Sequence, residues 1–207
     1  MRWALALLLL AATSAAEVCT GKSSQLPPTQ CNAYVDFFDD AGGPDWFLCE
    51  RSREDPCSCE GGPVTCNKEG TAITGLDFKD LNLVGSLPAS MSALVDLTSV
   101  DFDGNHLTGP LPALPWSKFE NKYACVLMGS SKGSRTNVFD CPLPDGSLAV
   151  PCQKVGPKGL SPILSTDCGP APAPTPPAPK QLYSCVNNTC VPKDAGVPMH
   201  KCKAACG

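Results

Sequence analysis

Apolar and charged residues alternate over a short stretch in the middle of the chain. Leu76 and Phe78 are apolar, whereas Asp77 and Lys79 are charged. Successive side chains of a β-strand point to opposite faces, so this pattern predicts a strand with one buried face and one charged face. The same order of apolar and charged residues returns around Phe102, which predicts a second strand of the same kind.

The two stretches are repeats of one another. Residues 73–83 align with residues 97–107, 24 positions later, and a Gly-x-Leu-Pro segment follows each of them. This period and the pattern of leucines resemble those of leucine-rich repeats. Asn105 occupies the asparagine position of the second unit, whereas Leu81 stands there in the first. The resemblance implies that each unit buries its apolar face against its neighbour.

The segment before the repeats resembles the N-terminal cap of plant-type leucine-rich-repeat proteins, in which a helix with acidic and aromatic residues precedes a Gly-Gly-x-x-Trp motif. The matching positions are Gly42, Gly43, Trp46, Asp55, Pro56, Cys57, Ser58, Val64, Thr65 and Cys66. The family has Trp where this chain has Cys59, and this chain has two extra residues before Cys66. The partner of Cys66 therefore stays open: Cys59 has the closer spacing and Cys57 the better match to the motif.

The segment after the repeats does not form a third good repeat. Its sequence Asn-Val-Phe-Asp-Cys, which begins at Asn137, resembles the C-terminal Cys-rich caps of secreted leucine-rich-repeat proteins from plants and protists. The resemblance implies two disulfide bonds among Cys125, Cys141, Cys152 and Cys168. About three repeats are normally needed for stability, so two repeats are expected to depend on bonded caps, each bond contributing about 2–4 kcal/mol.

These patterns predict an α/β solenoid, a short leucine-rich repeat with disulfide-bonded caps, followed by a Pro-rich linker and a small Cys-rich knot. The linker alternates proline with Ala and Thr, a composition that favours an extended polyproline II spacer. The expected domains are a signal peptide (1–16), an N-terminal Cys-rich cap (17–72), two repeats (73–120), a Cys-rich C-terminal cap (121–168), the linker (169–181) and a four-cysteine module (182–207).

The N-terminus has the features of a secretory signal peptide: Arg2, a short apolar run, and the small residues Ser14 and Ala16 before a cleavage site. The apolar run is shorter than the roughly 20 residues of a membrane span, so we expect a secreted protein without a span in the mature chain. An even number of cysteines in a secreted chain predicts disulfide bonds. The candidates are Cys19, Cys31, Cys49, Cys57, Cys59, Cys66, Cys125, Cys141, Cys152, Cys168, Cys185, Cys190, Cys202 and Cys206.

The net charge and the absence of certain motifs exclude several classes of function. A net charge of −4 disfavours nucleic acid as a partner. Two distant histidines, His106 and His200, and a Cys-Ser-Cys triplet do not give a zinc-finger spacing, so we expect no metal or other cofactor. No metalloprotease or P-loop motif occurs, so we predict a non-enzymatic protein.

The charged strand face supplies the candidate binding residues, which are Lys79, Asp80, Asp101 and Asp103. We expect these acids to be solvated, with pKa values close to their ordinary ones. Three interpretations stay open: a solvated face, a partner-binding face, and a carboxylate pair for glycoside hydrolysis. The last is the weakest, because Asp77 and Asp101 match a position that is commonly Asp in plant-type repeats.

We therefore expect a secreted protein that recognises an extracellular protein or polysaccharide. One alternative is inhibition of a secreted hydrolase, since plant polygalacturonase inhibitors belong to this repeat subclass. Another is attachment to polysaccharide or matrix through the four-cysteine module, where Lys193, Lys201 and Lys203 give a local basic character; the module could equally be a protease-resistant end. Asn187 lies in a sequence for N-glycosylation.

Overall fold

The computed structural model describes residues 19–59, 62–121, 123–130, 136–144, 152–169, 182–186 and 189–193. Contacts divide the chain into two units, residues 1–171 and residues 172–207. The predicted signal peptide, Asn187 and residues 194–207 of the four-cysteine module lie outside the described residues. The described part of the chain contains no helix with the length and hydrophobicity that a membrane span needs.

The α-helix of the first unit, α1 (Pro28–Asp40), has proline in its first turn. Proline is favoured there because its fixed φ suits a helix start and its missing N–H would have no partner. Tyr34, Phe37 and Phe38 are buried on one side of the helix, whereas Asp36 and Asp39 are exposed. The helix therefore packs through an aromatic face, as the sequence indicates.

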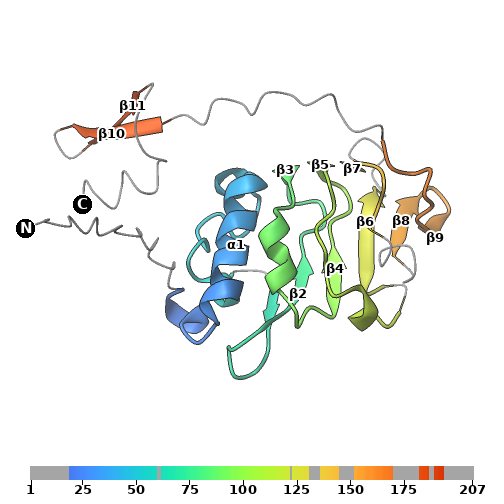
Figure 1. Cartoon of the computed structure of the whole chain (residues 1–207), viewed down its shortest axis with the longest axis horizontal. Coiled ribbons are helices and arrows are strands. Elements are labelled where there is room, and N and C mark those ends of the chain that lie inside the picture. The colour runs from blue at the N-terminus through green and yellow to red at the C-terminus, as the bar shows by residue number, and fades with distance from the viewer. Residues whose placement is uncertain are drawn as a thin grey trace, which may run out of the picture. The chain divides into compact units, whose positions relative to one another are not determined.

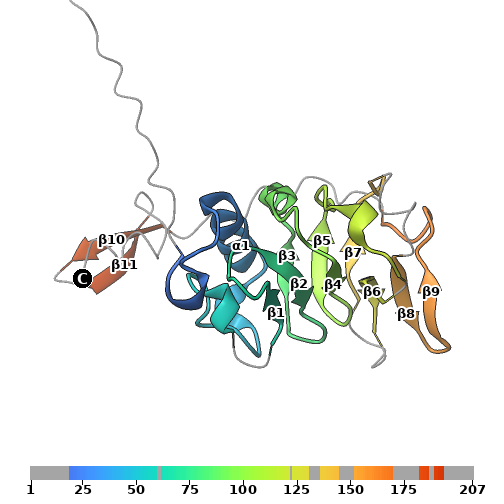
Figure 2. The same ribbon diagram turned by 90° about the horizontal axis from the view of Figure 1, so that it is seen from below.

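The larger sheet has six strands. Its four central strands are parallel and its two outer strands are antiparallel to their neighbours. Figures 1 and 2 show α1 near the end formed by β1 and β2, and β8 and β9 at the opposite end. The order is β1 (Val64–Cys66), β2 (Ile73–Asp77), β4 (Ser99–Asp101), β6 (Cys125–Gly129), β8 (Gln153–Gly156) and β9 (Gly159–Pro162).

A second sheet of three parallel strands comes from the segments between those strands. It consists of β3 (Val84–Ser86), β5 (His106–Gly109) and β7 (Val138–Phe139). Short 3-10 helices connect the elements of this unit: η1 (Gly21–Ser23), η2 (Gly43–Asp45), η3 (Pro56–Ser58), η4 (Ala89–Ala93) and η5 (Trp116–Lys118). The chain thus contributes alternately to the two sheets from β2 to β8 (Figure 2).

The second unit contains a two-stranded antiparallel hairpin, β10 (Leu182–Val186) and β11 (Thr189–Lys193). Its register places Cys185 opposite Cys190. The other two cysteines of the predicted module, Cys202 and Cys206, lie outside the described residues.

An aromatic cluster joins α1 to the larger sheet. The ring of Phe37 lies 5.1 Å from the rings of both Trp46 and Phe78, and 5.9 Å from the ring of Phe102. All four side chains are at most 3% exposed. Tilted and edge-to-face contacts of this kind add to the energy of burial, so the cluster fixes the helix against β2 and β4.

Asn105 connects neighbouring turns of the chain through its buried side chain. Its Nδ2 donates to the carbonyl oxygens of Phe78 (2.7 Å) and Phe102 (2.9 Å), and its Oδ1 accepts from the backbone N–H of Leu83 (2.9 Å). The side chain is 0% exposed. It therefore satisfies backbone groups where the chain leaves one sheet for the other, because those groups have no strand partner there.

Asn137 has the same role one strand further on. Its Nδ2 donates to the carbonyl oxygens of Phe102 (2.6 Å) and Leu127 (2.8 Å), and its Oδ1 accepts from the backbone N–H of Leu107 (2.8 Å). This hydrogen-bonding role of Asn137 was not predicted from the sequence. The sequence pattern that could have indicated this role is an asparagine with a buried apolar residue two positions later, as at Asn105.

The prediction of an α/β solenoid of leucine-rich repeats is wrong as the fold class. The structure is a mixed six-stranded sheet with a three-stranded sheet, and the described residues contain one α-helix and no series of repeated units. The spacing of paired strands is not constant: Leu76 lies opposite Val100, Val100 opposite Cys125, and Val126 opposite Gln153. These offsets of 24, 25 and 27 residues, and the reversal at β9, end the regularity that a repeat array requires.

The prediction of disulfide bonds is confirmed for ten of the fourteen candidate cysteines. Of the two alternatives for Cys66, the structure shows the bond to Cys57, and Cys59 pairs with Cys49 instead. The five bonds among the described residues are Cys19–Cys31, Cys49–Cys59, Cys57–Cys66, Cys125–Cys152 and Cys141–Cys168.

Candidate functional site

Lys79 and Asp103 form an ion pair on the charged face of the larger sheet. Lys79 follows β2 and Asp103 follows the neighbouring strand β4, so the parallel pairing of these strands brings the two residues together. The Lys79 Nζ lies 3.0 Å from Oδ1 and 3.2 Å from Oδ2 of Asp103. The Asp103 side chain is 0% exposed and that of Lys79 is 42% exposed. A buried carboxylate is costly unless it is paired, so Lys79 offsets the charge of Asp103.

Asp101 lies beside this pair and is half-buried. Its Oδ1 accepts a hydrogen bond from the backbone N–H of Asp103 at 3.1 Å. Burial raises the pKa of Asp101 to about 8, and the neighbouring Asp103 carboxylate acts in the same direction. The prediction of solvated acids with ordinary pKa values is therefore wrong for Asp101, because the fold removes it from water.

Asp80 occupies a different position from the other three predicted residues. It lies in the turn after β2 with a left-handed backbone (φ 55°). Its backbone N–H donates to the carbonyl oxygen of Asp103 at 2.9 Å. A Cβ atom at Gly104 would lie 2.0 Å from the Asp80 Oδ1, so this glycine provides the space for the carboxylate. The structure thus groups Lys79, Asp101 and Asp103 and places Asp80 at the adjoining turn.

A cavity of about 290 Å³ opens next to these charged residues, and we call it the sheet-face pocket. Lys79 and Asp101 form its charged side. Its other side is largely apolar and comes from the region of β6, β8 and β9, with Tyr123, Val126, Val155 and Leu160. Tyr123 is 66% exposed, whereas Val126 is only 4% exposed.

The apolar side of this pocket was not predicted from the sequence. A signal for it exists in β6, where Val126, Leu127 and Met128 follow one another without a polar residue and are all buried. A continuous apolar run predicts a strand that is covered on both faces. The polar face of β2 and β4 is therefore replaced by an apolar face at β6, and the sheet-face pocket lies where the two meet.

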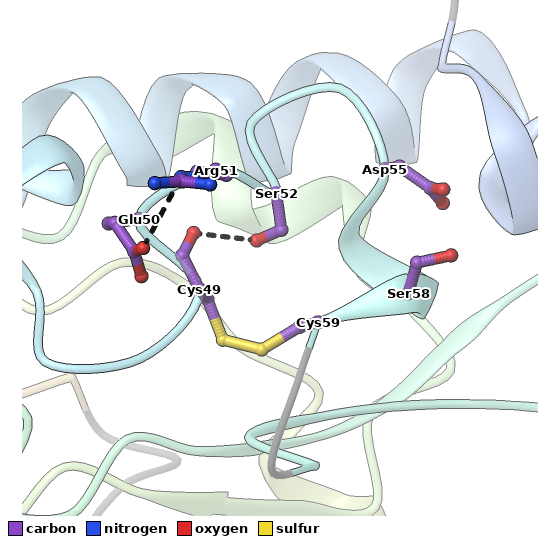
Figure 3. A pocket seen from close by; sticks show the side chains of 7 residues that line it. All are labelled: Cys49, Glu50, Arg51, Ser52, Asp55, Ser58 and Cys59. Carbon is purple, nitrogen blue, oxygen red and sulfur yellow. Dashed lines mark hydrogen bonds and ion pairs between the residues drawn. A yellow bond between two sulfur atoms is a disulfide. The ribbon is translucent and has the colours of Figure 1, made fainter.

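A second cavity, of about 250 Å³, lies over the Cys49–Cys59 disulfide (Figure 3). Glu50 and Arg51 pair at 3.7 Å at its edge, and the Ser52 hydroxyl donates to the Cys49 carbonyl oxygen at 2.9 Å.

The polar groups of this second cavity are largely engaged in hydrogen bonds and ion pairs within the protein. Although Asp55 lines it, its Oδ1 accepts from both the backbone N–H and the hydroxyl of Ser23, at 3.0 and 2.8 Å. Partial burial would raise the pKa of Asp55, but hydrogen bonds from Ser58 and Ser23 outweigh it and hold the pKa below its ordinary value. This cavity therefore lies where the segment around Asp55 packs against the segment around Ser23, and its polar groups stabilise that contact.

Among the described residues, no group of three or more His, Cys, Asp or Glu residues is arranged to hold a metal ion. His106 is exposed on β5. The sheet-face pocket is thus the site where polar and apolar groups converge most clearly in the described chain.

Replacement of Asp101 by asparagine is expected to change the pH dependence of stability. The folded protein holds the Asp101 proton more tightly than the unfolded chain, where an Asp pKa is about 3.9. Its contribution to the free energy of unfolding is therefore largest below about pH 4 and is lost as pH rises to about 8. Asp101→Asn should be more stable than the wild type by a margin that grows from about pH 4 to pH 8. Urea unfolding across this range measures the margin.

The control for this prediction is Asp36→Asn, which removes one exposed carboxylate from α1. A stability difference between Asp101→Asn and wild type that is the same at about pH 4 and pH 9 would contradict the assignment of a proton to Asp101.

Comparison with known proteins gives a partial similarity to a plant receptor. Over 59 residues the chain is 44% identical to the receptor protein kinase WSS1 of Oryza sativa subsp. japonica. The match covers 28% of this chain and 6% of the length of that protein. No family model matches the chain. The similarity therefore relates a segment of this protein to a small part of a receptor kinase, and it leaves the leucine-rich-repeat resemblance unconfirmed.

Proposed function

We propose that this protein recognises another protein outside the cell and that the sheet-face pocket is the centre of the contact. The observation that carries the proposal is the pocket itself, where half-buried Asp101 lies near the apolar Val126 and the exposed Tyr123. Ligand sites in proteins combine an apolar lining with a few placed polar groups. Exposed tyrosine is also frequent in protein interfaces.

Two observations support the extracellular part of the proposal. Five disulfide bonds occur in the described residues, and such bonds are typical of oxidising compartments. The partial similarity to a receptor kinase is compatible with recognition at or beyond the cell surface. The predicted signal peptide, residues 1–16, is a further expectation in the same direction.

Recognition is favoured over glycoside hydrolysis by the state of the two acids. Hydrolysis needs two carboxyl groups that both reach the substrate. Asp103 is fully buried and paired with Lys79, and Asp101 is the one carboxylate among the residues that line the pocket. The non-enzymatic function stays a prediction, and this arrangement supports it.

The two alternative functions have less support. Inhibition of a hydrolase would be one form of protein recognition, and no contact among the described residues favours a hydrolase over another protein partner. Attachment to polysaccharide depends on residues of the four-cysteine module that lie outside the described chain. Neither alternative is favoured by a specific contact.

Photo-crosslinking tests the proposal. A benzophenone amino acid replaces Tyr123 in the full-length, disulfide-bonded protein, and in a matched variant it replaces Val95, which is similarly exposed but does not line the pocket. Each variant is mixed with extracellular fluid, or with intact cells, from the tissue that produces the protein, and is then irradiated. We expect the variant at position 123 to crosslink a defined extracellular protein. If both variants give the same crosslinked products, or neither gives any, the pocket is not the contact.

A further inference from the structure

We infer that the sheet-face pocket binds the cationic side chain of one arginine or lysine, presented by an extended segment of a protein partner. Asp101 is the counter-ion, and the apolar lining receives the methylene stem. This inference rests on the proposed function and adds the chemistry of the contact.

The first argument is the charge around the pocket. Lys79 is already paired with the buried Asp103. Asp77 lies opposite Asp101 in the β2–β4 register and is exposed, and Asp80 lies in the adjoining turn. The surroundings of Asp101 thus carry more negative than positive charge, and a positively charged partner is complementary to them.

The second argument is the form of the lining. Val126, Val155 and Leu160 offer an apolar surface close to a single carboxylate. Arginine and lysine are the side chains that combine a long apolar stem with a cationic end, and they bury the stem along apolar surface. The exposed ring of Tyr123 adds a face for a cation–π contact.

The third argument is size. A volume of about 290 Å³ lies at the lower end of the range for small-molecule pockets, which is about 300–1,000 Å³. This volume is sufficient for one long side chain. Among its lining residues Tyr123 is the sole aromatic, so the pocket has no row of rings on which a sugar chain could stack. An acidic segment would be repelled by the exposed Asp77.

Binding of a cation at this pocket should change the protonation of Asp101. The charged groups around Asp101 are Asp77 from β2, Lys79 and Asp80 from the turn after it, and Asp103 from the end of β4. On β8, Lys154 is paired with Asp167. A cation placed at Asp101 favours its ionised form, so binding near neutral pH should release a proton, and affinity should rise with pH.

A peptide selection tests the inference. The probe is a displayed library of random linear peptides, selected in parallel against the full-length protein, its Asp101→Asn variant and the control Asp36→Asn. Asp36→Asn makes the same chemical change at an exposed position of α1. We expect wild type and Asp36→Asn to enrich peptides that carry Arg or Lys beside apolar residues, and Asp101→Asn to lose this enrichment.

A synthetic peptide from the enriched set then gives the quantitative test. Replacement of its basic residue by glutamine should weaken binding by about tenfold or more, which corresponds to about 1.4 kcal/mol. Tyr123→Ala should weaken it as well, and affinity for wild type should rise from about pH 6 to pH 8.

Three results would overturn the inference: no enriched peptide, enrichment without basic residues, or basic peptides that bind Asp101→Asn as well as wild type. The proposed function fails separately, through the crosslinking experiment. If Tyr123 crosslinks a protein partner while the selection gives apolar or acidic peptides, recognition by the pocket stands and the cationic occupant is wrong.

Discussion

Replacement of Asn105 by alanine is expected to lower the free energy of unfolding by about 3–5 kcal/mol. The change leaves the N–H of Leu83 and the carbonyl oxygen of Phe78 without their side-chain partner in a fully buried region. The carbonyl oxygen of Phe102 loses one of two side-chain donors and keeps the bond from Asn137. Each buried polar group that loses its partner costs about 1–3 kcal/mol. Denaturant unfolding of the disulfide-bonded protein, followed by circular dichroism, measures the loss.

Two variants control this result. Asn105→Asp keeps the acceptor for Leu83 but places a carboxylate against carbonyl oxygens, so we expect it to be at least as destabilising as alanine. His106→Ala changes the next residue, which is exposed, and should alter stability by no more than about 0.5 kcal/mol. A loss below about 1 kcal/mol for Asn105→Ala would show that water or other groups replace its hydrogen bonds.

The second large effect is expected for Phe37→Ala, at about 3–5 kcal/mol. Phe37 is 0% exposed, and its ring contacts those of Trp46, Phe78 and Phe102. Its loss opens a cavity between α1 and two strands at once, and a rigid core fills such a cavity only in part. Thermal or urea unfolding measures the change.

Phe47→Ala provides the comparison, because the Phe47 side chain is 59% exposed and its truncation removes little buried surface. Phe37→Leu should cost much less than Phe37→Ala, since leucine retains most of the buried volume. Equal losses for Phe37→Ala and Phe47→Ala would mean that the aromatic cluster does not secure the helix.

Local patterns in the sequence predicted the local elements of this protein well. The alternation at Leu76 and Phe78 predicted β2 and its buried face, and both side chains are at most 1% exposed. The spacing of 24 residues between the two similar stretches is the offset at which β2 pairs with β4. These successes share a cause: side-chain periodicity is decided by neighbours in the chain.

The arrangement beyond β4 could not be predicted in the same way. The pairing of β6 with β8 joins Val126 to Gln153, and β9 then returns antiparallel. Such pairings between distant segments depend on how the whole core packs, which no short window of the sequence contains. The prediction of a two-repeat solenoid closed by disulfide-bonded caps failed for this reason.

The charged residues of the candidate site were predicted from the sequence, but the burial of their side chains was not. The sequence grouped Lys79, Asp101 and Asp103 correctly, because residues at equal positions of paired strands lie together. It did not show that Asp103 is fully buried or that Asp101 is half-buried. Nor did it place Tyr123 and Leu160 at the same pocket, since they come from later, irregularly spaced segments.

The positions of the disulfide bonds divide the covalent structure of the first unit in two. Every bond lies either within residues 19–66 or within residues 125–168, and the sequence has no cysteine from residue 67 to residue 124. The strands β2 and β4 and the Asn105 hydrogen bonds belong to this unbridged interval. A single peptide-bond cut there would leave two separately cross-linked fragments, joined by strand pairing and core contacts alone, so that denaturant without reductant would separate them.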